Sequence, residues 1–430
     1  MLRLYKMLKR LWVFAFAAGT LLFFGGWQTA LPRATYIDGV DVGGMARTAA
    51  VAAVRKNTVS RLKDKRLTVR AGECVYTFAY PQFNFTDDLG ELCASVRGPG
   101  NYFSHTRVYL NCMDIVVEDI CSRLDSPVRE PSATFCKTGR PFLYDGGCDG
   151  CAADRGRLAR DIVNSINGEF CIVEVQKAVI RRTVSLDVVK RETQLLSSFD
   201  TLYDASNAPR SSNIALAASK INGCVLRPGQ IFSFNAVVGP RTAQNGFLSA
   251  KIISGGQFVQ GIGGGVCQVS TTLYNAALLS GLKITEYHPH SLLVSYVAPS
   301  RDAMVSGSSC DLKFKNTSNT PVYIRVGASN GRISCSVYGL PDGASRSLVS
   351  QVTGSLPQPQ DVLMPGVGGV ITQGRQGTLS CGYLVEERGG TRTKTLIRTD
   401  RYAPLATVRY AETSPPSDET FYFVKKASCG

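Results

Sequence analysis

A run of glycines that leads into a cysteine is the stretch of this sequence most suited to covalent chemistry. The run spans residues 261–265, and Cys267 follows two positions later. Val269 and Leu273 then begin an apolar pattern with helical spacing. Cys267 is therefore expected in the first turn of a helix, where unpaired N–H groups and the helix dipole stabilise an anion. That setting lowers the pKa of a thiol and raises its thiolate fraction, as a cysteine nucleophile requires.

The residues on either side of the cysteine are expected to contact a substrate. Gly264 and Gly265 have no Cβ, so a substrate can approach the backbone closely, and the N–H groups there could receive an oxyanion. Gln268 is a candidate oxyanion donor, although a surface hydrogen bond at the helix start is an equal alternative. The competing interpretation of Cys267 is a buried structural cysteine that follows a flexible turn.

A cysteine nucleophile needs a base within hydrogen-bond reach, and two of the three histidines of the chain are suitably placed. His288 and His290 flank Pro289, which stiffens the segment. In an extended segment, residues i and i+2 point to the same side, so the spacing does not choose between the two histidines. The alternative is a pair of exposed polar histidines beside a turn. The third histidine, His105, is expected to be structural.

An orienting carboxylate for the base is expected at Asp302, with Arg301 beside it. The guanidinium of Arg301 is a candidate for binding a substrate carboxylate, or else it pairs with Asp302 alone. Three other residues are alternative orienting groups, namely Glu286, Asn275 and Asn235.

The elements that must position these side chains follow an α+β pattern. Between residues 196 and 340 we expect a helix over 212–222, strands over 231–235, 250–253, 282–287, 291–297 and 333–338, and a hairpin of 312–315 with 322–326. Between residues 36 and 190 we expect helices at 48–54, 91–96 and 155–166, a hairpin of 67–70 with 75–78, and strands at 171–175 and 183–189. The first region has the residue types for chemistry, and the second has the character of a binding or spacer module.

The N-terminus indicates the compartment. Residues 1–10 form a short basic leader, and an uncharged apolar run over residues 11–31 has the length of a membrane-spanning helix. Positive charge on the leading side predicts a single-pass signal anchor in the cell membrane, with the bulk of the chain outside the cytoplasm. A cleaved signal peptide is the alternative.

The amino-acid composition limits the classes of molecule that the chain is expected to bind. The 48 basic and 33 acidic residues give a net charge of +15, which suits an anionic membrane surface or anionic wall polymers. The basic residues are dispersed and no aromatic–basic stripe is present, so nucleic acid is not expected as a partner. The spacing of Cys148 and Cys151 resembles one half of a zinc site. No second pair of ligands lies at a convincing distance in the sequence, so a disulfide or two thiols are favoured over a metal.

The C-terminal part is expected to be a Gly/Pro/Ser-rich linker over residues 341–366, a small β-rich segment over 367–411 and a polar tail over 412–430. Because this segment has no candidate chemistry, adhesion or spacing is its expected role.

The sequence around the candidate nucleophile resembles the VanW family. The resemblance covers residues 196–340 and is carried by residues 226–235, 263–275, 290–291, 294–297 and 301–303. The preceding region, 36–190, is similar through residues 39–45 to domains assigned to peptidoglycan binding that commonly precede VanW domains. Residues 367–411 loosely resemble a G5-like domain through 368–370 and 400–404. Ser300 is a departure, since the family often has glycine before the Arg–Asp pair.

The resemblance implies a function in the cell wall. The family takes its name from glycopeptide (vancomycin) resistance clusters, and members have been associated with L,D-transpeptidation of peptidoglycan through the cysteine that matches Cys267. This implies that Cys267 attacks a stem-peptide carbonyl, that His290 is the preferred base with His288 as the alternative, and that Asp302 orients it. Peptidoglycan stem peptides and glycan are then the expected partners, and no cofactor or metal is expected. A cysteine carboxypeptidase or endopeptidase and a non-catalytic wall-binding protein are the alternatives.

Overall fold

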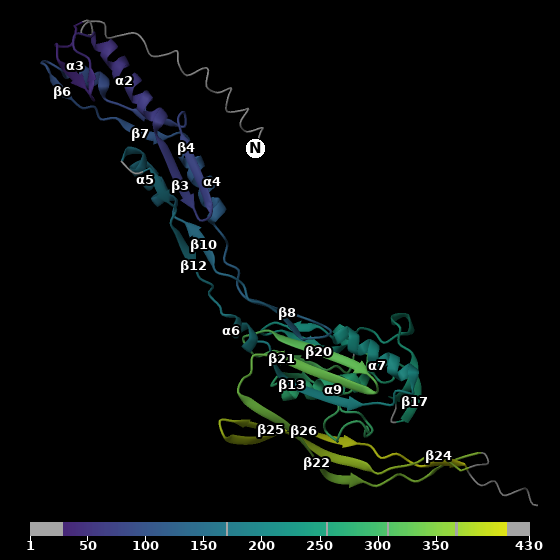
Figure 1. Ribbon diagram of the computed structural model, residues 1–430. Coiled ribbons are helices and arrows are strands. Elements are labelled where there is room, and N and C mark those ends of the chain that lie inside the picture. Colours follow the sequence, from purple (N-terminus) through teal and green to yellow (C-terminus); the bar gives the residue numbers. More distant parts are fainter. Residues whose placement is uncertain (1–28, 169–170, 255–256, 308, 366–368, 411–430) are drawn as a thin grey trace, which may run out of the picture. The chain divides into compact units, whose positions relative to one another are not determined.

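A computed structural model of the chain describes residues 29–168, 171–254, 257–307, 309–365 and 369–410 (Figure 1). The described residues have a mixed α/β architecture with more strand than helix. The chain divides into two compact units, one formed by Met1–Arg129 with Cys148–Arg182 and the other by Glu130–Gly147 with Thr183–Gly430.

The predicted leader at residues 1–10 and the predicted tail at 412–430 lie outside the described residues, as does all but the end of the predicted membrane span at 11–31. Of the helices that the structure does describe, none combines the length and the hydropathy needed to cross a membrane.

The first unit contains two small α/β cores. Its helices are α2 (Arg47–Asp64), α3 (Leu89–Ser95), α4 (Met113–Leu124) and α5 (Arg155–Asn167). Its strands are β1 (Thr35–Ile37), β2 (Val40–Asp41), β3 (Arg66–Ala71), β4 (Cys74–Ala79), β5 (Phe83–Thr86), β6 (Gly100–Tyr102), β7 (Arg107–Leu110), β10 (Gly150–Ala153), β11 (Ile172–Glu174) and β12 (Lys177–Ile180). One core joins α2 and α3 to the sheet β2-β1-β6, and the other joins α4 and α5 to the sheet β11-β3-β4.

Helix α5 shows why the sequence prediction succeeds in this unit. The Asp154 carboxylate caps the helix by accepting a hydrogen bond from the Arg157 N–H. Leu158, Ile162 and Ile166 follow at four-residue spacing, and all three are buried in the second core. A cap and a single apolar stripe are local features, so the sequence alone indicates the helix.

The second unit is built on a four-stranded antiparallel sheet with the order β13-β21-β20-β14. Its helices are α6 (Leu186–Arg191), α7 (Ala208–Ile221), α8 (Phe234–Val238) and α9 (Val266–Leu279). Its strands are β8 (Ser132–Phe135), β9 (Phe142–Asp145), β13 (Gln194–Leu202), β14 (Cys224–Leu226), β15 (Ile231–Ser233), β16 (Ser249–Ser254), β17 (Gln257–Ile262), β18 (Lys283–Glu286), β19 (Lys313–Lys315), β20 (Val322–Ser329), β21 (Arg332–Gly339), β22 (Ala344–Leu356), β23 (Val362–Met364), β24 (Val370–Thr372), β25 (Gly377–Arg388), β26 (Thr391–Tyr402) and β27 (Val408–Tyr410).

The two faces of this sheet are covered by different segments. Ile324 and Val337 belong to the set of alternate residues of β20 and β21 that is buried in the core containing α7 and α9. Tyr323 and Tyr338, which alternate with them, contact the rings of Phe135 and Phe142 from the hairpin β8–β9. The hairpin therefore belongs to the second unit, which corrects the expected domain boundaries of 36–190.

Three further expectations are wrong. The predicted strand at 183–189 is largely helix α6, because Ser185 caps it by accepting from the Val188 N–H and the cap outweighs the β-branched residues. Residues 291–297 form bends and irregular backbone instead of a strand. The segments 312–315 and 322–326 are strands but not a hairpin, since β19 pairs with β15 and β18 while β20 pairs with β21 and β14.

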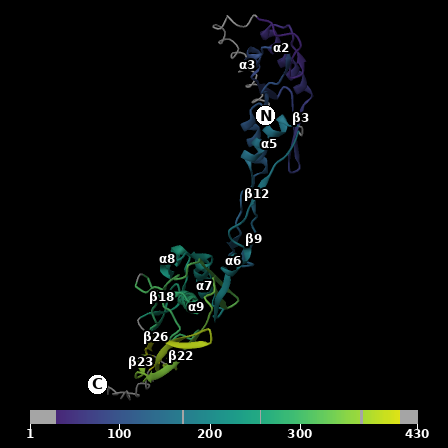
Figure 2. The ribbon, with the colours of Figure 1, turned by 90° about the vertical axis from the view of Figure 1, so that its left-hand side faces the viewer.

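The prediction of a linker at 341–366 is also wrong. It contains β22, a 13-residue strand that pairs along its length with β25, and β25 pairs with β26. The continuous pairing of β22 with β25 outweighs the Gly/Pro/Ser content of the segment. The C-terminal sheet β22-β25-β26 therefore begins at residue 344, and β22 contacts α9, next to which it also lies in the view of Figure 2.

Candidate functional site

Helix α9 begins at the glycine run, and the backbone there requires glycine. Gly263 and Gly265 have φ values of 87° and 107°, which L side chains rarely adopt. A Cβ on Gly264 would lie 2.7 Å from the Lys251 carbonyl oxygen in the neighbouring hairpin β16–β17. The glycines thus let the chain turn tightly against the hairpin and enter α9 with Cys267 in its first turn.

Cys267 is partly exposed, although most of α9 is buried. Val266 and all residues from Gln268 to Leu278 are buried, whereas Cys267 lines a cavity of about 990 Å³. His290 lines the same cavity, and the two side chains are close enough to shift each other's pKa. The sulfur also lies 3.4 Å from the Val305 carbonyl oxygen. The structure therefore brings together the predicted nucleophile and the preferred base.

His290 is held by Asp302. The Asp302 Oδ2 atom lies 2.6 Å from Nδ1 of the ring and accepts the backbone N–H of His290 at 2.7 Å. With Nδ1 occupied by the carboxylate, Nε2 is the ring nitrogen available to the sulfur. Both residues are buried, His290 being 4% and Asp302 0% exposed. Cys267, His290 and Asp302 thus have the connectivity of nucleophile, base and orienting acid.

The electrostatics of the three groups favour a thiolate–imidazolium pair. Burial raises the pKa of the Cys267 thiol, but the hydrogen bond with His290 and the charge of His290 outweigh it and lower the pKa below its ordinary value. Burial lowers the pKa of His290, but the hydrogen bonds to Asp302 and Cys267 outweigh it and raise the pKa to about 9. For Asp302, burial is outweighed by His290, Arg398 and Tyr402, so its pKa is lowered.

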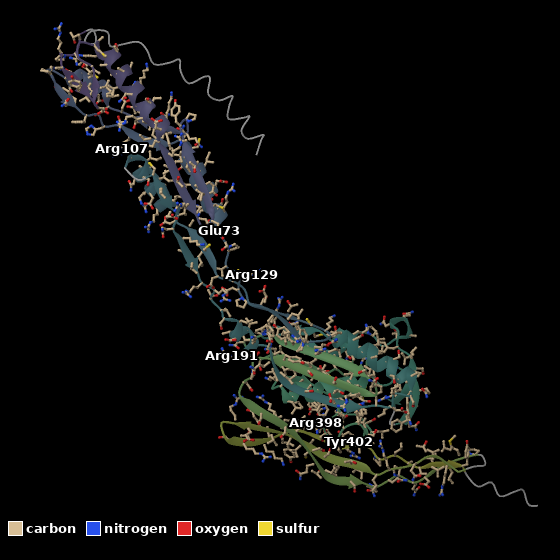
Figure 3. The ribbon with its side chains drawn as sticks, viewed as in Figure 1. Glu73, Arg107, Arg129, Arg191, Arg398 and Tyr402 are labelled. Carbon is tan, nitrogen blue, oxygen red and sulfur yellow. The ribbon has the colours of Figure 1, made fainter. Side chains whose placement is uncertain are left out.

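A second pair of side chains, from the C-terminal sheet, holds the other oxygen of Asp302. The Tyr402 hydroxyl donates to Asp302 Oδ1 at 2.6 Å, and Arg398 Nη2 lies 3.3 Å from the same oxygen. Arg398 Nη1 also donates to the Asp302 carbonyl oxygen at 2.5 Å, and Asp400 binds the guanidinium through both of its oxygens. Arg398 and Tyr402 are buried on β26, and Figure 3 labels them where this sheet adjoins the rest of the second unit. We call Arg398, Asp400 and Tyr402 the β26 clamp.

Ser300 connects the clamp to the turn before Asp302. Its N–H donates to the Tyr402 hydroxyl at 2.7 Å, and its hydroxyl lies 2.7 Å from that of Ser380. Ser300 has φ 57°, a left-handed conformation that glycine adopts without cost. This explains why glycine suits the position in the VanW family, and the hydrogen bond to Ser380 offsets the strain here.

Backbone donors face the start of α9. Within the part of the chain that the structure describes, the N–H groups of Gly264, Gly265 and Cys267 donate to no protein acceptor. Two of these residues, Gly264 and Gly265, line the cavity beside the sulfur. Their role as donors to an oxyanion stays a prediction. Gln268 is different, because its side chain accepts from Arg210 and donates to Thr201 and Leu202.

Other predicted residues lie elsewhere. His288 binds Glu286 at 3.0 Å and does not line the cavity, and Glu286 also binds Lys313. Arg301 donates to Asn275 and lies over the ring of Phe199, so the structure places it neither in the cavity nor against the Asp302 carboxylate.

Asn235 lines the cavity but binds Arg241 instead of a histidine. His105, expected to be structural, binds Asp88 in the first unit. The described residues include no group of three or more His, Cys, Asp or Glu side chains suited to a metal ion.

Sequence reasoning missed the β26 clamp and Arg241. Arg398, Asp400 and Tyr402 alternate along β26 and therefore share one face, and that face is buried. In the sequence, the signal for this face is the alternation of these three polar residues at period two. Arg241, which follows a Gly–Pro turn, lines the cavity and carries no local pattern that would indicate its role.

The lowered pKa of Cys267 predicts an unusual pH dependence of alkylation. From about pH 8 to about pH 6, an ordinary exposed thiol loses nearly 10²-fold of its thiolate, and its alkylation slows in proportion. Because the pKa of Cys267 is lowered, more of its thiolate persists as the pH falls, and its alkylation by iodoacetamide is expected to slow by a smaller factor than that of the ordinary thiol. Peptide-level mass spectrometry measures both thiols together, with the exposed Cys74 as the internal reference. Equal slopes for the two thiols would contradict the thiolate–imidazolium pair.

Comparison with known proteins defines the class. Residues 209–338 match the family model described as VanW like protein. This match to residues 209–338 confirms the resemblance found in the sequence.

Two relatives are each similar to about a third of the chain. The uncharacterized protein YoaR of Bacillus subtilis is 44% identical over 146 residues, which are 34% of this chain and 48% of the relative. The vancomycin B-type resistance protein VanW of Enterococcus faecalis is 26% identical over 166 residues, 37% of this chain and 58% of the relative. The chain thus spans about half the length of these relatives. No solved structure matches it.

Proposed function

We propose that this chain is a cell-wall enzyme of the VanW family that acts as an L,D-transpeptidase on peptidoglycan stem peptides. The observation that carries the proposal is the series of contacts Cys267–His290–Asp302 at the wall of an open cavity. A buried structural cysteine would have neither an activating base nor access for a substrate. Such a cysteine exists in the same unit at Cys335, which is buried and whose pKa burial raises.

The geometry supports a two-step acyl transfer. The Cys267 thiolate attacks the carbonyl carbon of the third stem residue, and the oxyanion that forms is stabilised by N–H groups at the start of α9. Collapse of this intermediate breaks the amide bond, and the amine of the terminal D-alanine leaves with the proton of the His290 imidazolium. A side-chain amine of a neighbouring stem then attacks the thioester, His290 takes its proton, and the thiolate is released with a 3-3 cross-link formed.

The location of the chain belongs to the same proposal. The basic leader and the apolar run at 11–31 support a single-pass anchor with the enzyme on the outer face of the membrane. The net charge of +15 supports attraction to anionic wall polymers, and the first unit is the candidate for binding glycan.

The test is to incubate the purified full-length chain with disaccharide tetrapeptides and to analyse products and protein by mass spectrometry. We expect joined stems that have lost one D-alanine, and a transient thioester on the peptide that contains Cys267. A thioester that yields only shortened, unjoined stems would assign the protein as a carboxypeptidase. Absence of both thioester and products, with the glycan still bound, would assign it as a wall-binding protein.

A further inference from the structure

Besides His290, the cavity beside Cys267 is lined by three cationic side chains, Arg210, Arg241 and Lys251. Among the described residues, none of these three forms an ion pair with a carboxylate. Arg210 has a polar partner, since its Nη2 donates to Gln268 at 2.7 Å. Lys251 has an aromatic partner, since its Nζ lies 4.6 Å from the centre of the Phe258 ring. The third cation, Arg241, has a hydrogen-bond partner for only one of its two terminal nitrogens.

Arg241 carries an unused donor that solvent does not reach. Its Nη1 donates to Asn235 at 2.7 Å, whereas its Nη2 is buried and has no partner in the described structure. Burial lowers the pKa of Arg241, while the charges of Cys267 and Asp311 raise it in part. A buried guanidinium nitrogen without an acceptor is costly, and a site that keeps one is complete only when an acceptor arrives.

Arg241 is also fixed close to the nucleophile. Its Cβ and Cγ lie 3.2 and 3.4 Å from the position of a Cβ on Gly263, four residues before Cys267. The base of the Arg241 side chain is thus held against the turn that presents the sulfur. Arg301, for which the sequence suggested carboxylate binding, lies outside this cavity.

We propose that Arg241 binds the C-terminal carboxylate of the donor peptide. This inference rests on the proposed function and names the group that positions the donor. In a tetrapeptide stem, the terminal carboxylate belongs to the residue whose amine leaves, so it is separated from the scissile carbonyl by one residue only. A carboxylate in the cavity would satisfy this donor once the guanidinium turns Nη2 toward it, and would hold the scissile carbonyl beside the sulfur. It leaves with the D-alanine, which opens the cavity for the acceptor amine.

The experiment compares two donors, a disaccharide tetrapeptide with a free terminal carboxylate and the same compound as the primary amide. The rate of thioester formation on Cys267 is followed in a single turnover by mass spectrometry of the intact full-length protein. We expect the wild type to prefer the acid by at least about tenfold, and Arg241→Met to bring the ratio close to one by slowing the acid alone. Arg241→Lys is expected to keep part of the preference, because it retains charge without the planar fork.

The ratio of two rates on one preparation does not depend on the fraction of protein that is folded, so a partly unfolded variant still gives a result. Lys251→Met is the matched control, because it removes one positive charge from the same cavity and is expected to keep the ratio. Equal rates for acid and amide in the wild type would overturn the carboxylate assignment while leaving the proposed function standing. A ratio lost in Lys251→Met but kept in Arg241→Met would move the carboxylate to Lys251. No thioester from either donor would contradict the proposed function itself.

Discussion

Cys267→Ala is expected to remove thioester formation completely and to reduce 3-3 cross-linking to the uncatalysed background, a loss of at least about 10³-fold. The reason is that no other side chain at this position is suited to be the nucleophile that forms the covalent intermediate. Of the side chains around the sulfur, His290 is occupied on Nδ1 by Asp302 and is the proposed base, while Gln268 is fully hydrogen-bonded. Cross-linking is measured on disaccharide tetrapeptides with the full-length protein.

Cys224→Ala is the matched control for this variant. Cys224 is a partly buried cysteine on β14 of the same unit, and burial raises the pKa of its thiol, so it is not suited to act as a nucleophile. The control is expected to retain the rate of the wild type. If Cys267→Ala formed cross-links at that rate as well, the enzymatic proposal would be wrong.

Arg398→Met is expected to lower both stability and activity, although Arg398 does not contact the sulfur. The variant leaves Asp400 buried without its bidentate partner and removes one of the groups that hold Asp302. Breaking a buried ion pair in this way costs about 3–5 kcal/mol of unfolding free energy. Because His290 loses part of its orientation, thioester formation is expected to slow by about 10²-fold. Denaturant unfolding and single-turnover kinetics measure the two effects.

Two companion variants separate orientation from folding. Arg401→Met changes an exposed arginine on the same strand and is expected to alter neither quantity. Tyr402→Phe removes only the hydroxyl that donates to Asp302, so it is expected to shift the pH profile of Cys267 alkylation toward that of an ordinary thiol. An Arg398→Met protein with the alkylation profile of the wild type would show that the β26 clamp is structural only.

The stability effect of Arg398→Met has a defined pH dependence. The pKa of Asp302 is lowered in the folded protein, so its charged form contributes stability above the ordinary carboxyl pKa. The contribution is lost as the pH falls through the lowered pKa. The difference in unfolding free energy between wild type and variant is therefore expected to be largest near neutral pH and to decrease in acid.

The sequence indicates the three candidate site residues because the information is local. The glycine run, the helix that follows it and the His–Pro–His segment each lie within a few residues, and the structure brings Cys267, His290 and Asp302 together. The same reasoning misassigned Arg301, because the alternation of residues in a loop does not show which side chain faces the cavity. The choice between His288 and His290 was made by the family resemblance alone, and the contacts of His288 with Glu286 give its physical reason.

What the sequence could not predict depends on contacts between distant segments. The hairpin β8–β9 is separated by almost 180 residues from the strand β20 that it covers, and nothing in its own residues indicates that partner. The β26 clamp reaches Asp302 across about 100 residues. The Gly, Pro and Ser content of residues 341–366 predicts a linker, but the pairing of strand β22 with β25 outweighs that composition.

The β26 clamp determines how far a recombinant fragment must extend to contain the whole site. The recognisable VanW-like stretch ends at Val337–Tyr338, yet an acid inside it depends on side chains some sixty positions further on. A recombinant fragment trimmed to the region of similarity would also lack β13, the strand that pairs with β21. Such a fragment would expose the buried side of α9 and leave a carboxylate facing solvent. Failure of that fragment to act on muropeptides would thus report on an incomplete enzyme, not on the chemistry of its cysteine.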